Sequence, residues 1–322
     1  MKAIRVAAVG GPEVLTLQDV PSPSPPPGHV SVRIAAAGVN FIEIYQRTGL
    51  YPVPLPWTPG GEGAGEVVAL GDGVGGLRVG DRVASVNLLG SYSEQALVPE
   101  ERAVTVPEGL DMETAAAALL QGMTAHYLVF STFPIRQGQA CLIHAAAGGV
   151  GLLLVQLARR LGARVFATVG TDEKARLARE AGADHTIVYT REDFVAIVKE
   201  ATSGKGVDVV YDSVGQATFD RSLECLAPLG KLALFGQSSG VVPPLSPAVL
   251  AQKGSLFLTR PVLFHYIADR ATLAWRAGEV MGWIRDGSLK LRIGRRYPLA
   301  EAAEAHRALA ARETVGKLLL LP

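Results

Sequence analysis

The stretch that most constrains the fold is Ala140–Ala163, ACLIHAAAGGVGLLLVQLARRLGA. Its first five residues form an apolar run typical of a buried strand, and small residues follow over Ala145–Gly151. Apolar residues then recur at helical spacing, as Val150, Leu154, Leu157 and Leu161. We therefore predict a strand, a tight turn and a helix in succession. Small residues in such a turn allow close packing of helix on strand and bring backbone N–H groups near a bound phosphate.

The turn follows the dinucleotide-binding pattern G-x-G-x-x-G only in part. Gly148 and Gly151 are in place, but Ala146 stands where the first glycine belongs. A strand before the turn and a helix after it are the context that this pattern requires. From this stretch alone two interpretations are open: a site for the pyrophosphate of a dinucleotide, or an ordinary tight turn of an α/β protein.

Length and composition limit the classes of protein. A chain of 322 residues exceeds the usual domain size of about 100–200 residues, so we expect two domains. No apolar run approaches the ~20 residues of a membrane span. A net charge of +1 gives no electrostatic reason to expect a nucleic-acid or membrane partner. The N-terminus has no signal-peptide pattern, which predicts a cytoplasmic protein. Cys141 and Cys225 are expected to be buried thiols rather than a disulfide.

The chain changes character along its length. The first ~115 residues are β-rich and predict a compact antiparallel, barrel-like domain. The short apolar or alternating runs in this part are Lys2–Val6, Leu15–Val20, Val30–Ala36, Gly65–Leu70 and Asp81–Ser85. A helical pattern then covers Asp111–Leu128. From about Gly254 the pattern changes again and ends in the apolar strand Lys317–Leu321, which we expect to return to the first domain.

Between these parts, strands and helices alternate regularly. We predict strands at Arg164–Val169, Thr186–Val188, Val207–Asp212 and Lys231–Phe235, and helices at Asp172–Ala181, Glu192–Thr202 and Thr218–Leu226. Such alternation predicts a doubly wound parallel sheet covered on both faces, with a ligand at the carboxyl ends of its strands. We place the domain boundaries at residues 1–120, 121–255 and 256–322.

The end of the predicted strand Arg164–Val169 bears on which dinucleotide binds. NAD sites usually present an acid there to the ribose 2′-OH, but here the strand ends in Gly170 and Thr171. Asp172 and Glu173 follow as first-turn helix residues, a position that helix capping explains. The missing acid favours NADP. Lys174 is either a ligand of its 2′-phosphate, with Thr171 as a hydroxyl donor, or a solvated helix residue; position alone leaves both open.

Metal ligands are missing from the places where zinc dehydrogenases carry them. The chain has no closely spaced cysteines for a structural zinc site. The segment Pro59–Gly63 resembles the G-H-E segment of zinc alcohol dehydrogenases, with Gly61 in place of the ligand His; Asn40 stands where those enzymes have a ligand Cys. Asn and Gly do not replace thiolate and imidazole around zinc. We predict no metal, and without a Lewis acid for an alkoxide, alcohol oxidation loses its main support.

Six segments together resemble a known family: Ala37–Pro52, Leu120–Leu128, His144–Gly151, Val210–Gly215, Phe235–Gly240 and Lys253–Pro261. They are similar to the zinc-free quinone oxidoreductases, the zeta-crystallin-like branch of the medium-chain dehydrogenase/reductase superfamily. The resemblance covers essentially the whole chain in order. The family's pattern A-x-x-G-x-x-G is met by Ala145, Gly148 and Gly151, so Ala146 is no longer an anomaly.

The resemblance implies an α/β fold in which a Rossmann domain is inserted in a GroES-like β-barrel catalytic domain, with NADPH as cofactor and a homodimer as assembly. Lys174 and Tyr189, joined by Arg312, match the residues that hold the 2′-phosphate. The full set of expected cofactor contacts is Asn40, Thr124, Ala145, Gly148, Gly149, Val150, Gly151, Thr171, Lys174, Tyr189, Phe235, Gly236, Ser238, Ser239 and Arg312. Arg260 is a family match without an assigned role.

The catalytic candidates are Asn40, Tyr45 and Tyr51, which match family residues near the quinone pocket. Alternative interpretations are that Asn40 caps a helix and that the tyrosines belong to the core. The expected activity is hydride transfer from NADPH to a quinone without metal, in which we hypothesise that Tyr45 and Asn40 position the acceptor oxygen. Two alternatives are an NADPH-dependent reductase of activated C=C bonds, such as an enone, and an NADPH-binding protein with little turnover.

Overall fold

The computed structural model describes residues 1–322, which divide into two compact units. One unit comprises Met1–Gln121 together with Ile267–Pro322, and the other comprises Gly122–Tyr266. Each unit has a hydrophobic core of its own. No helix is both long and apolar enough to span a membrane.

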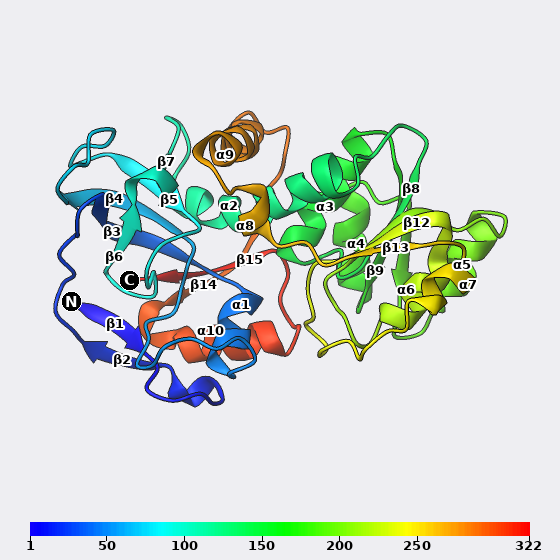
Figure 1. Cartoon of the computed structure of the whole chain (residues 1–322), viewed down its shortest axis with the longest axis horizontal. Coiled ribbons are helices and arrows are strands. Elements are labelled where there is room, and N and C mark those ends of the chain that lie inside the picture. The colour runs from blue at the N-terminus through cyan, green and yellow to red at the C-terminus, as the bar shows by residue number, and fades with distance from the viewer. The chain divides into compact units, whose positions relative to one another are not determined.

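The Gly122–Tyr266 unit is built on a six-stranded sheet in which every neighbouring pair is parallel (Figure 1). Its strands are β8 (Ala140–Ile143), β9 (Arg164–Val169), β10 (His185–Val188), β11 (Val207–Asp212), β12 (Leu226–Leu234) and β13 (Phe257–Thr259). The spatial order β10-β9-β8-β11-β12-β13 is that of the doubly wound dinucleotide-binding sheet. The strand order reverses between β8 and β11, where such sheets bind their ligands.

Two pairs of helices follow the strands of this sheet. The helices of the unit are α3 (Gly149–Arg160), α4 (Asp172–Glu180), α5 (Phe194–Ala201), α6 (Phe219–Cys225), α7 (Ala248–Gln252) and α8 (Leu263–Tyr266). Helices α3 and α4 contact each other and pack on β8, β9 and β10, whereas α5 contacts α6, which packs on β11 and β12. Right-handed crossovers from a central strand in both directions place these two pairs on opposite faces of the sheet.

The unit extends further along the chain than the boundary that we placed at residue 255. Strand β13 pairs in parallel with β12, as Lys231 with Phe257 and Ala233 with Thr259. This pairing adds a sixth strand to the sheet, so the compact unit continues to Tyr266.

The other unit contains a seven-stranded sheet and a separate two-stranded one. Strands β1 (Lys2–Arg5) and β2 (Thr16–Asp19) pair with each other. The larger sheet contains β3 (His29–Val39), β4 (Gly63–Leu70), β5 (Arg82–Ser85), β6 (Gln95–Pro99), β7 (Val104–Thr105), β14 (Ile293–Pro298) and β15 (Lys317–Leu321). Its order is β14-β15-β3-β4-β5-β7, with β6 also paired to β3. Only β14 and β15 pair in parallel. The C-terminal strand β15 therefore lies within the sheet, between β14 and β3.

Three helices and three short 3₁₀ turns belong to this unit. They are α1 (Phe41–Arg47), α9 (Arg270–Arg285) and α10 (Ala302–Ala310), with 3₁₀ turns η1 (Pro12–Val14), η2 (Glu100–Arg102) and η4 (Leu299–Glu301). Helix α10 packs on α1, η1 and β15. Helix α2 (Met112–Tyr127) connects the two units and continues as a π-helical turn over Leu128–Thr132.

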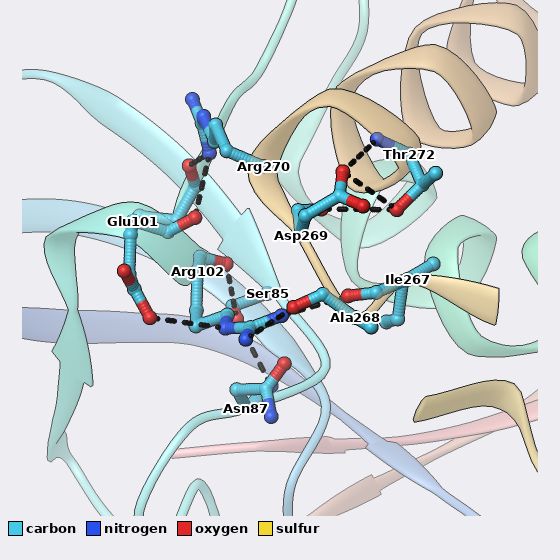
Figure 2. A network of polar contacts seen from close by, with 10 residues as sticks. Ser85, Asn87, Glu101, Arg102, Ile267, Ala268, Asp269, Arg270 and Thr272 are labelled. Atoms are coloured by element: carbon cyan, nitrogen blue, oxygen red, sulfur yellow. Dashed lines mark hydrogen bonds and ion pairs between the residues drawn. The ribbon is translucent and has the colours of Figure 1, made fainter. Parts of the chain in front are cut away.

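Polar contacts tie the returning segment to the first part of this unit (Figure 2). The Arg102 guanidinium donates to the carbonyl oxygens of Ile267, at 2.7 Å, and Ala268, at 2.8 Å. The side chain of Asp269 caps α9 by accepting a 2.8 Å hydrogen bond from the backbone N–H of Thr272. These contacts satisfy backbone groups at a crossover that has no strand pairing of its own.

Candidate functional site

The turn between β8 and α3 has the geometry of a phosphate cradle. Ala145 has a left-handed backbone with φ 51°, and its carbonyl oxygen accepts a 2.9 Å hydrogen bond from the backbone N–H of Gly148. A Cβ atom on Gly151 would lie 2.4 Å from that same oxygen, so only glycine fits there. Helix α3 begins at Gly149, and the N–H groups of a first helical turn have no partners within the helix. They are suited to a pyrophosphate.

A buried polar chain lies under this turn, and our sequence analysis missed it. His144 Nδ1 is 2.7 Å from Thr168 Oγ1, and His144 Nε2 is 3.0 Å from Ser222 Oγ. Ser222 in turn donates to Asp212 Oδ2 at 3.0 Å. Because Ser222 uses its proton on Asp212, its oxygen accepts from Nε2–H, and Thr168 donates to Nδ1. Burial lowers the pKa of His144, which keeps the imidazole neutral. The chain links the ends of β8, β9 and β11.

The chain segments after β9 and β10 lie against each other and carry the predicted 2′-phosphate residues. The N–H of Tyr189 donates to Val169 O at 3.1 Å, and Thr190 Oγ1 donates to Gly170 O at 3.3 Å. The hydroxyl of Tyr189 lies 3.2 Å from where a Cβ of Gly170 would be. Thr171 caps α4 through its hydroxyl, which accepts from the N–H of Lys174 at 3.2 Å. Thr171, Lys174 and Tyr189 thus belong to one edge of the sheet.

The loop after β12 carries four more of the predicted cofactor contacts, Phe235, Gly236, Ser238 and Ser239. It is bonded to the loop after β11, because Ser239 Oγ donates to Val214 O at 2.7 Å and accepts from the N–H of Ala217 at 2.9 Å. A Cβ on Gly236 would lie 2.6 Å from Ser213 O. The Ser239 hydroxyl is therefore used in bonds between these two loops, and it fixes the loop after β12 beside the loop after β11.

Two other predicted contacts stand apart in the fold. Thr124 lies on α2 and is 7% exposed. Arg312 follows α10 in the other unit, with a left-handed backbone of φ 59°.

A buried ion pair lies beside Asn40 and next to Gly61, the two positions that match the ligand Cys and His of zinc alcohol dehydrogenases. Lys317 Nζ lies 2.5 Å from Glu62 Oε2 and donates to Asn40 Oδ1 at 2.6 Å. The Asn40 amide donates to Glu62 Oε2 at 3.1 Å, and the N–H of Leu120 donates to Glu62 Oε1 at 2.7 Å. Lys317 and Glu62 are both fully buried.

This donor set does not fit a zinc ion. An ammonium group is already paired with the only carboxylate of the set, Asn40 offers an amide, and Gly61 has no side chain. No group of three or more His, Cys, Asp and Glu side chains is placed to hold a metal. Gly38 makes room for the pair, since a Cβ there would lie 2.3 Å from Glu62 Oε2 and 2.7 Å from Lys317 Cε. Lys317 escaped our sequence analysis because it begins an otherwise apolar strand.

The ion pair is continuous with helix α1, which carries the predicted catalytic tyrosines. Asn40 precedes α1, and its N–H donates to Glu43 Oε2 at 2.9 Å. Tyr45 lies on α1 with its ring centroid 5.3 Å from that of Tyr51, in an edge-on arrangement, and the N–H of Tyr51 donates to Tyr45 O at 3.0 Å. Both rings are only partly buried. Both N–H groups of the Asn40 amide are used, on Glu62 and on Gly38 O, so Asn40 belongs to the network that places α1.

Removing one member of the pair leaves a buried charge, and this predicts a large loss of stability. Lys317→Met is expected to lower the free energy of unfolding by about 3–5 kcal/mol, whereas adding Glu62→Gln recovers much of that loss. The matched control is Lys2→Met, whose partner Asp19 is exposed, so that its loss is expected to change stability far less. Urea-induced unfolding measures all three. A Lys317→Met loss no larger than that of Lys2→Met would contradict the assignment.

Glu43 makes stability depend on pH in a direction opposite to that of most acids. Burial raises the pKa of its carboxyl from 4.5 to about 7. Since the folded state holds this proton more tightly, the stabilisation is fully present below pH 4.5 and is lost as the pH rises to 7. Compared with Glu43→Gln, the unchanged chain should lose about 3 kcal/mol of its free energy of unfolding as the pH rises from 4.5 to about 7. The free energies of unfolding of both proteins, measured across this pH range, test the prediction. Profiles that run parallel for the two proteins would contradict it.

Comparisons with known proteins agree with this architecture. Residues 26–108 match the alcohol dehydrogenase GroES-like domain, and residues 149–262 match the zinc-binding dehydrogenase family. The chain is therefore a GroES-like domain combined with a Rossmann domain, although the residues described above do not fit the metal in the second family's description.

Relatives are similar over the full length. A quinone oxidoreductase of Pseudomonas aeruginosa is 49% identical, with 100% of this chain and 99% of the relative covered. A 2-haloacrylate reductase of a Burkholderia species is 43% identical over 97% and 96%. The crystal structure of Escherichia coli quinone oxidoreductase complexed with NADPH superposes on this chain with a TM-score of 0.98. The two sequences are 43% identical, and both chains are covered completely. The chain thus belongs to the zinc-free quinone oxidoreductases of the medium-chain dehydrogenase/reductase superfamily.

Proposed function

We propose that this chain is an NADPH-dependent quinone reductase that works without a metal ion. NADPH, when bound, supplies a hydride, and a quinone that accepts it needs one further proton from solvent to become the hydroquinone. The relatives named quinone oxidoreductase and the NADPH complex of one of them support this assignment.

The observation that carries the proposal is the Lys317–Glu62 pair, where a dehydrogenase would hold its Lewis acid. Oxidation of an alcohol passes through an alkoxide, and the negative charge on its oxygen must be stabilised, usually by a metal ion that acts as a Lewis acid. A quinone spreads the charge it gains over its own ring and oxygens. The site of this chain therefore suits an acceptor that stabilises its own charge.

We assign the protein's residues to binding and orientation. The first turn of α3 and the turn residues Ala145, Gly148 and Gly151 would hold the pyrophosphate, and Lys174 and Tyr189 the 2′-phosphate, joined by Arg312. The network of Asn40, Glu62 and Lys317 keeps α1 in place. Tyr45, on that helix, would offer its hydroxyl to the acceptor oxygen, beside Tyr51.

A second candidate is the reduction of activated C=C bonds, which the similarity to a 2-haloacrylate reductase favours. Hydride addition to an enone leaves an enolate that must be protonated at carbon. A phenol such as that of Tyr45 then matters more than in quinone reduction, because the proton must be delivered to a defined atom.

Two finer assignments accompany the proposal. We propose a homodimer, supported by the edge strand β13, where Phe257 and Leu258 are exposed beside an unpaired strand edge. We also propose a cytoplasmic location, for which the N-terminal sequence is the support.

One steady-state experiment tests the function and separates the two candidates. NADPH oxidation is followed with 1,2-naphthoquinone and with an alkenal, for the unchanged chain and for Tyr45→Phe. We expect the quinone to be the better acceptor, a modest loss of kcat/KM on the quinone in Tyr45→Phe, and about 10²-fold or greater loss on any alkenal activity. Faster turnover of the alkenal would favour the second candidate, and no turnover of either acceptor would refute the proposal. An unchanged kcat/KM of Tyr45→Phe on quinones would remove Tyr45 from its assigned role.

A further inference from the structure

An ion pair at the edge of the proposed 2′-phosphate site has no part in the function derived so far. Arg191, just after β10, binds Asp172 in the first turn of α4 through both terminal nitrogens of its guanidinium group. Nη1 donates to Oδ2 at 2.7 Å, and Nη2 donates to Oδ1. Both side chains are exposed, so the pair contributes little to stability. Its position suggests a different purpose.

The pair lies among the groups that we assign to the phosphate. Asp172 is two residues before Lys174, and Arg191 is two residues after Tyr189. The segments that carry them are bonded to each other through Tyr189 N–H on Val169 O and through Thr190 Oγ1 on Gly170 O. A free carboxylate at Asp172 would therefore add negative charge beside a phosphate that carries about −1.5 to −2 charges.

We infer that Arg191 is a determinant of cofactor specificity, because it neutralises Asp172 and so admits the 2′-phosphate of NADPH. An unmasked acid at the end of this strand is the device by which NAD sites hold the ribose 2′-OH and repel a 2′-phosphate. In this chain no acid stands at the strand end itself, and the bidentate contact from Arg191 neutralises Asp172, the first acid beyond that end. Arg191 acts through Asp172 and does not contact the phosphate itself.

Geometry and charge agree on the direction of the effect. The Arg191 guanidinium lowers the pKa of Asp172, so the carboxylate stays ionised and paired throughout the neutral range. Loss of Arg191 would leave that charge uncompensated, and Glu173 in the same helical turn would add to it. The uncharged 2′-OH of NADH would hardly respond.

A double-mutant cycle on cofactor binding tests this inference, which rests on the proposed use of NADPH. Dissociation constants of NADPH and NADH are measured by fluorescence titration for the unchanged chain, Arg191→Ala, Asp172→Asn and the double variant. We expect Arg191→Ala to weaken NADPH about 5-fold and NADH less than 2-fold, with a smaller difference at high salt. Asp172→Asn should leave NADPH at least as tight, and the double variant should return to within about 2-fold of the unchanged chain.

The control and the contrary outcomes are specific. Arg176→Ala removes another exposed arginine of the same region, paired with Glu180 on α4, and should change neither constant. If the double variant remains as weak as Arg191→Ala, Arg191 binds the phosphate directly and the inference is overturned. Equal weakening of NADPH and NADH also overturns it. If the unchanged chain binds NADPH no better than NADH, the proposed cofactor itself fails, which is a different result.

Discussion

The ion pair between Lys317 and Glu62 is the interaction on which the catalytic unit depends. Two charges at full burial are costly to desolvate, and only close pairing with further hydrogen bonds offsets that cost. Asn40 and the N–H of Leu120 supply those bonds. The four groups come from the ends of β3, β4 and β15 and from α2, so the pair fastens the C-terminal strand to the start of α1. A protein cation thus lies beside Asn40, a position that matches a zinc ligand of related dehydrogenases, and it is paired with Glu62.

The nucleotide-binding unit fixes its loops with a buried chain of hydrogen bonds rather than with an ion pair. The chain from Thr168 through His144 and Ser222 to Asp212 joins three strand ends beneath the glycine-rich turn. Asp212 Oδ1 also accepts from the N–H groups of Val214, at 2.7 Å, and Gly215, at 3.0 Å. These bonds fix the loops that follow β8, β9 and β11, and α3, whose first-turn N–H groups have no partners within the helix, begins directly after the first of them. Rigid support of this kind lets backbone groups, which carry no net charge, select a phosphate position.

Local sequence signals predicted much of this fold. The strands Arg164–Val169, Val207–Asp212 and Lys317–Leu321 were predicted at their observed bounds, since each is an apolar run between turn residues. The strands β6, β7, β13 and β14 were missed, because strands that are short or lack an apolar pattern of their own are defined by their partners. The N-terminal unit was expected to be an antiparallel, barrel-like GroES-like domain, and its match to that family confirms the fold. The parallel β14–β15 pair at one end of its seven-stranded sheet was not predicted.

The candidate site divides in the same way. The turn at Ala145–Gly151 is a local backbone requirement and was predictable from its small residues. Lys317 and Glu62 are 255 positions apart, and the pairing of β3 with both β15 and β4 brings them together. His144 and Ser222, 78 positions apart, likewise meet through the strand order. Contacts of this kind depend on the order of the strands in the sheet, so no sequence pattern within either segment predicts them.

If the Lys317–Glu62 ion pair has taken the place of a Lewis acid, the reaction does not depend on zinc. Purified protein is analysed for bound zinc by mass spectrometry, and NADPH-dependent reduction of 1,2-naphthoquinone is measured before and after dialysis against a strong chelator. The account predicts only substoichiometric zinc and an unchanged rate. One tightly bound zinc per chain, with activity lost on chelation and restored by added zinc, would contradict it.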